Sequence, residues 1–138
     1  MTKFDLSKFT LADTATLEVL DVDGESPLLG ENDKPVSIDL HGPGSEVYVK
    51  AQARLDQQVQ QIGMQSAMAM QRGKAPKDTA DEMRKANVER LAACTKQINN
   101  FPVAPSDVYG NPGLIYITRQ VERFLGDMGN FSRRSGKT

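Results

Sequence analysis

The side chains that most often carry out chemistry are few in this chain. His41 is the only histidine, and no cysteine stands near it at the spacing that metal ligands require. Cys94 is the only cysteine, so an internal disulfide is excluded, and no sequence signature provides a histidine that would activate its thiol. We therefore predict that His41 ends a strand and that Cys94 is a buried, inert thiol on a helix face.

The carboxylates are scattered, and most of them stand in turns or at helix starts, where capping of backbone N–H groups explains them. Examples are Asp21, Asp23, Glu25, Asp39, Asp78, Asp81 and Glu82. Nothing in their spacing selects one pair as a general acid and a general base. The segment Gly136-Lys137-Thr138 has the residues that end a phosphate-binding loop, but the glycine required upstream is missing. We predict no enzymatic activity, no cofactor and no metal site.

The composition predicts one soluble, intracellular domain with a modest core. The chain has 138 residues, of which 38% are hydrophobic and 25% charged, and it contains no tryptophan. A net charge of −1 gives no electrostatic reason to expect nucleic acid or an anionic membrane as a partner. No window approaches the roughly 18 apolar residues of a membrane-spanning helix, and the N-terminus lacks an apolar signal core.

The first part of the chain predicts an arm followed by a β-hairpin. Residues 1–13 form a short arm with several apolar side chains. Residues 14–41 form the hairpin, because the segments 14–22 and 36–41 alternate between apolar and polar residues on either side of a turn-rich loop. Two strands alone are only marginally stable, so a helix or a strand from another chain must support them.

The next part predicts two antiparallel helices. Ser45 is a suitable cap for the first, over about residues 46–72, in which apolar residues recur every three or four positions. Thr79 and Glu82 form a capping box for the second, over about residues 79–97, and its apolar stripe includes Cys94. The loop between the two helices is short, which makes them antiparallel neighbours.

A third helix closes the predicted domain. Asn111 can cap it, Pro112 suits its first position, and the helix should end by about Gly129. We expect it to pack across the first two helices, within a helical part at 45–131 that is followed by a flexible tail at 132–138. The predicted fold is therefore a single α+β domain, 1–138, mainly helical, with an N-terminal β-hairpin followed by three main α-helices.

The sequence of this last helix also carries a recognisable pattern. It contains Asn111-Pro112, Ile117, Gln120-Val121, Phe124-Leu125, Asp127 and Asn130-Phe131. Further matching segments are Phe4-Asp5-Leu6, the helix start Ser45-Glu46-x-Tyr48, and Leu91-Ala92-Ala93-Cys94-Thr95. Together they make the chain resemble the small tail assembly chaperones of long-tailed bacteriophages. Relatives in that family often have a tryptophan-containing loop where this chain has residues 96–102, and Phe101 is our suggestion for the missing aromatic.

The resemblance implies a function and partners. Chaperones of this family bind the long, helical tape-measure protein, keep its apolar face from aggregating, help to recruit the tail-tube protein, and are absent from the mature particle. It also implies a cytoplasmic location in the bacterial host cell and a mechanism that needs neither ATP nor metal. Association into a homo-oligomer stays open. The alternative is a structural component of the phage tail, such as a tube or connector subunit, which remains in the particle.

Amphipathic character, and not any known family contact, selects the side chains that we expect to touch a partner. They are Phe4, Leu6, Phe9, Met64, Met68, Tyr116, Phe124 and Phe131. Met64 and Met68, with Met70 nearby, have two interpretations. The favoured one is that they fill the core, and the other is that they form a pliable surface for a helical partner, because methionine side chains adapt to irregular apolar shapes.

Overall fold

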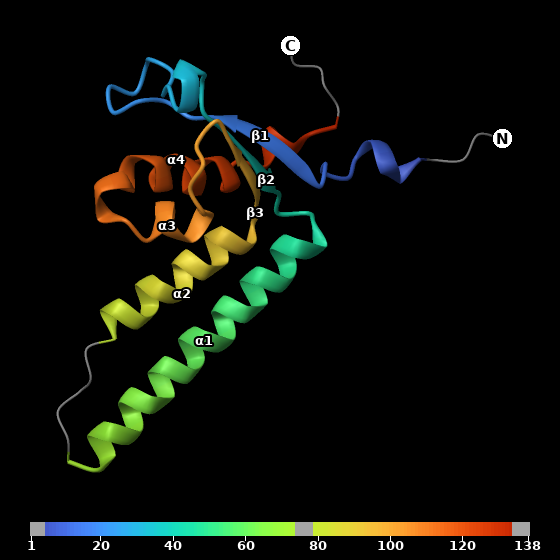
Figure 1. The fold of residues 1–138 in the computed structure, drawn as a ribbon. Helices are drawn as coiled ribbons and strands as arrows, with labels where there is room; N and C mark the ends of the chain where they lie inside the picture. The colour runs from blue at the N-terminus through green and yellow to red at the C-terminus, as the bar shows by residue number, and fades with distance from the viewer. Residues whose placement is uncertain (1–4, 74–78, 134–138) are drawn as a thin grey trace.

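The computed structural model describes residues 5–73 and 79–133, and it has the α+β fold that the sequence predicts (Figure 1). Its sheet has three antiparallel strands, and its helices include the antiparallel pair that projects from the sheet. The strands are β1 (Thr14–Glu18), β2 (Ser37–His41) and β3 (Thr95–Asn99). The α-helices are α1 (Glu46–Gln71), α2 (Ala80–Ala93), α3 (Pro105–Tyr109) and α4 (Ile115–Leu125). Short 3₁₀ turns are η1 (Leu6–Lys8), η2 (Glu31–Asp33), η3 (Pro112–Leu114) and η4 (Met128–Phe131).

The side chains of the central strand β2 alternate between an apolar face and a polar face of the sheet. Ile38 and Leu40 are fully buried on one face, as the alternating pattern of β2 predicts. On the other face, Thr16 donates a hydrogen bond of 2.7 Å to Asp39, and the Asn99 amide donates one of 2.9 Å to Ser37. The apolar face therefore packs against the helices, and the polar side chains satisfy one another across the strands.

The strand β3 corrects the prediction that the second helix continues to residue 97. The helix α2 ends at Ala93, Cys94 follows as its C-terminal cap, and Thr95–Asn99 pairs with the free edge of β2. The pairing begins where the His41 N–H donates to the Cys94 carbonyl at 2.7 Å. The physical reason is that a two-stranded hairpin leaves backbone groups unpaired along its edge, and a third strand satisfies them.

The helix α1 matches its prediction closely, and the start of α2 does not. The Ser45 side chain accepts a hydrogen bond of 3.1 Å from the Tyr48 N–H and so caps α1. The Thr79 side chain, in contrast, makes no capping hydrogen bond with any described residue, so the predicted capping box is not formed by Thr79. As predicted, α1 and α2 lie side by side, and the pair extends away from the sheet (Figure 1).

The C-terminal helix is shorter than predicted and packs elsewhere. Asn111 accepts from the Gly113 N–H at 2.9 Å, as predicted, but this cap opens the turn η3, and α4 itself ends at Leu125. Instead of crossing the helical pair, α4 lies beside the sheet with α3 next to it (Figure 1). The Gln120 side chain joins α4 to the hairpin, since it accepts from the Leu20 N–H at 2.7 Å and donates to the Leu20 carbonyl at 2.8 Å.

Candidate functional site

The side chains that we predicted to touch a partner lie in three separate places. Phe4 is outside the described residues. Leu6 and Phe9 belong to the N-terminal arm predicted at residues 1–13, of which residues 5–13 are described, and they are 67% and 51% exposed. The methionines are on α1, and the remaining aromatic residues are on α4 and η4. The structure therefore does not assemble one continuous contact surface from the predicted set.

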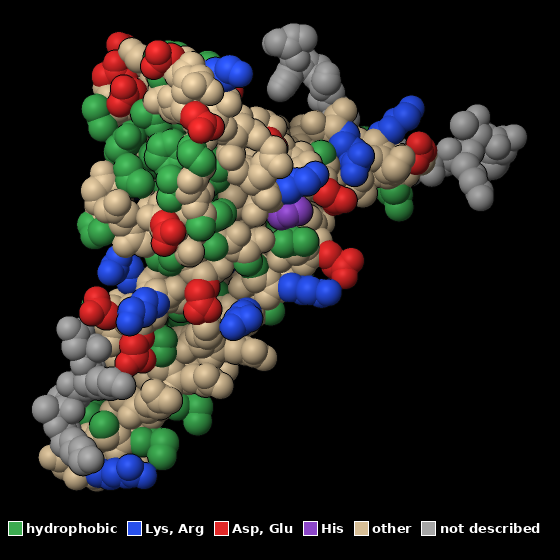
Figure 2. Space-filling view, viewed as in Figure 1, with side chains coloured by type: hydrophobic (Ala, Val, Ile, Leu, Met, Phe, Trp, Pro, Cys, Tyr) green, Lys and Arg blue, Asp and Glu red, His purple; other side chains and the backbone are tan. Residues whose placement is uncertain are grey.

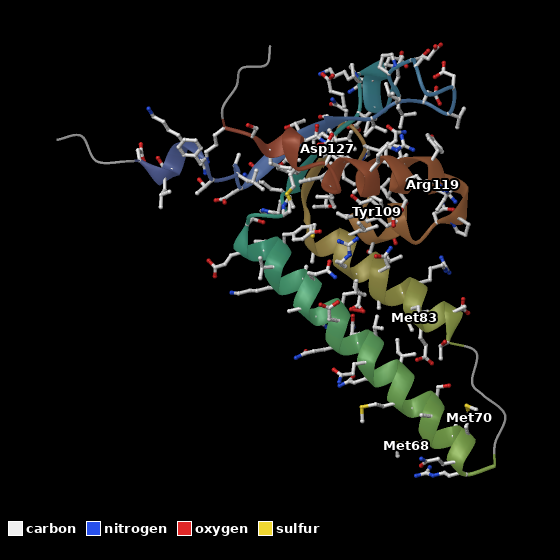
Figure 3. All side chains as sticks on the ribbon, turned by 180° about the vertical axis from the view of Figure 1, so that it is seen from behind. Met68, Met70, Met83, Tyr109, Arg119 and Asp127 are labelled. Atoms are coloured by element: carbon white, nitrogen blue, oxygen red, sulfur yellow. The ribbon has the colours of Figure 1, made fainter. Side chains whose placement is uncertain are left out.

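The far half of α1 exposes several apolar side chains (Figure 2). We call Met64 and Met68, which lie one turn apart on the same face of α1, the α1 methionine surface; they are 58% and 48% exposed. Met70 and Val59, which are 58% and 38% exposed, point to the other side of the helix. Figure 3 shows Met68 and Met70 at the end of α1 that is farthest from the sheet. The favoured prediction that these methionines fill the core is therefore wrong, because α2 covers only the side of α1 on which Ala51 and Ile62 are buried.

The same part of α1 carries no charge. Residues 57–71 contain only glutamine, serine, glycine and apolar side chains. Charged side chains stand on either side of it: Arg54, which forms an exposed pair with Glu89 at 3.8 Å, precedes it, and Arg72 follows it. An uncharged surface with flexible methionines can bury an apolar helix face without desolvating a charge, and methionine can adapt to the shape of its partner.

The aromatic residues near the C-terminus have mixed positions. Tyr116 and Phe124 are half-buried against the core. Phe131 is 1% exposed and packs edge-to-face against Phe124, with ring centroids 5.5 Å apart. A surface role for Phe131 in the folded chain is therefore corrected: its ring lies directly on the Gly42 backbone, where an added Cβ would overlap it.

A hollow lies between α2 on one side and α3, η3 and α4 on the other. We call it the α2–α4 groove; its apolar wall is formed by Val88, Leu91, Tyr109, Pro112 and Ile115, and its volume is about 320 Å³. Sequence reasoning did not find this groove. Its one sequence signal is Thr118, a hydroxyl residue on the apolar stripe of α4. Thr118 is 6% exposed and lines the groove, and its hydroxyl has no hydrogen-bond partner among the described residues.

Tyr109 closes the inner end of this region with a hydrogen bond to the sheet. Its hydroxyl lies 2.7 Å from the Thr95 hydroxyl, which in turn donates to the Leu91 carbonyl at 2.8 Å. Burial raises the pKa of Tyr109 to about 12, although the hydrogen bond to Thr95 opposes the rise. This arrangement links α3, β3 and α2, so it is structural. Figure 3 shows Tyr109 among these elements.

The raised pKa of Tyr109 predicts a loss of stability at high pH. An unfolded tyrosine ionises near pH 10, but the folded chain keeps Tyr109 neutral to about 12. The stabilisation is complete below pH 10 and is lost at about 1.4 kcal/mol per pH unit between pH 10 and 12. Urea unfolding at pH 9 and pH 11 should show a larger loss for wild type than for Tyr109→Phe. Equal losses for the two proteins would contradict the assignment.

The residues considered for chemistry take structural positions. Cys94 is fully buried, and burial raises the pKa of its thiol while the nearby Arg90 charge opposes the rise, which disfavours the reactive thiolate. His41 ends β2, as the sequence predicts. Within 5–73 and 79–133, no group of three or more histidine, cysteine, aspartate or glutamate side chains is arranged to hold a metal ion.

Neither the hydropathy of the described helices nor the comparisons with known proteins identify a function. None of the helices in the described part of the chain combines the length and hydropathy needed to cross a membrane. No family model matches the chain, and neither a curated protein nor a solved structure matches it. The case for a function therefore depends on the exposed apolar surfaces of the chain and on the resemblance noted in its sequence.

Proposed function

We propose that this chain is a tail assembly chaperone of a long-tailed bacteriophage or prophage, acting in the cytoplasm of the bacterial host. It would hold apolar helix surface of the tape-measure protein until the tail-tube protein assembles around it. The observation that supports this proposal best is the α1 methionine surface, which is exposed and uncharged and lies at the end of a projecting helical pair. The sequence pattern near the C-terminus supports the same reading.

The proposed mechanism is reversible burial of apolar surface. Full burial of a methionine side chain contributes about 1.5–3 kcal/mol, and Met64 and Met68 have about half of their surface left to bury. Association also costs translational and side-chain freedom, which offsets part of this gain. A contact made by a few partly exposed methionine side chains therefore forms and dissociates readily. That behaviour suits a chaperone which must release its partner, and it requires neither nucleotide hydrolysis nor a metal.

Co-expression with a helical fragment of the tape-measure protein tests the proposal. Wild type should keep the fragment soluble, and the double variant Met64→Gln, Met68→Gln should reduce its soluble fraction at least tenfold, because glutamine keeps helix propensity but removes the apolar surface. The matched control is Gln60→Ala, Gln61→Ala, at exposed positions on the same helix, which should behave as wild type. Aggregation of the fragment that wild type does not change would refute the proposal.

The protein composition of purified phage particles distinguishes a chaperone from a structural component of the tail. Mass spectrometry of purified phage particles should detect the tape-measure and tail-tube proteins but not this chain. A stoichiometric amount of this chain in the particles would show that it is a virion component, and the chaperone proposal would then be abandoned.

A further inference from the structure

We draw no further inference here: the strongest candidate, the apolar α2–α4 groove, carries none because nothing in the described part of the structure shows what covers it.

Discussion

Replacement of Phe131 with alanine is expected to lower the free energy of unfolding by about 3–5 kcal/mol. The Phe131 side chain is 1% exposed, and its ring contacts Phe124 edge-to-face and lies against the Gly42 backbone. Removal of the ring leaves a cavity where three segments meet, namely η4, the end of β2 and the base of the arm. Urea denaturation of the two proteins measures the difference.

The matched control for Phe131 is in the same 3₁₀ turn. Met128 is 61% exposed, so Met128→Ala should change the free energy of unfolding by no more than about 0.5 kcal/mol. Similar losses for the two substitutions would show that the burial of the Phe131 ring does not determine its contribution to stability. A Phe131→Ala protein as stable as wild type would return Phe131 to the set of surface contacts.

Replacement of Gly30 with alanine is expected to cost about 3 kcal/mol, for the opposite reason of overpacking. A Cβ at residue 30 would overlap the Asn100 carbonyl oxygen and lie 2.8 Å from the Val36 Cγ2. The Asn100 carbonyl also accepts from the Glu31 N–H at 2.7 Å, so it cannot move away without loss of that bond. The clash therefore separates the long hairpin loop from the segment that follows β3. Thermal unfolding should show the loss of stability as a lower melting temperature.

Gly63 provides the comparison for Gly30, because replacement of Gly63 with alanine should raise the free energy of unfolding and not lower it. Apart from its chain neighbours and the adjoining α1 backbone, no described atom lies within 4 Å of a Cβ added at residue 63, which is inside α1. Gly63→Ala should therefore raise the free energy of unfolding by about 0.5–1 kcal/mol, since alanine restricts the unfolded chain and favours the helix. Destabilisation by Gly63→Ala would show that this part of α1 is in close contact with another chain.

The strand β3, which the sequence did not predict, shows that the local spacing of apolar residues does not always distinguish a helix from a strand. Leu91, Cys94 and Ile98 continue at helical spacing, so the pattern predicted a helix through residue 97. In the structure Ile98 is instead opposite Ile38, on the apolar face of the sheet. The spacing of apolar residues was the same for both outcomes, and the unpaired edge of β2, distant in sequence, selected the strand.

The predicted contact residues show a similar division. In α4, Ile117, Val121 and Leu125 recur every four residues, and all three are buried. The pattern did not distinguish Phe131, which is buried, from Met68, which is 48% exposed, since each is an apolar residue near the end of its segment. Their burial depends on which surface lies opposite, and that is a tertiary property.

The sequence by itself determined the fold class, the hairpin, the long helix with its Ser45 cap, and the Asn111 cap, because each depends on residues that are close together in the chain. Only the tertiary structure decided the third strand, the burial of Phe131, the exposure of the α1 methionine surface, and the α2–α4 groove. These features arise where segments far apart in sequence meet or fail to meet. An apolar side chain carries the same local signal whether a neighbouring element covers it or leaves it to a partner.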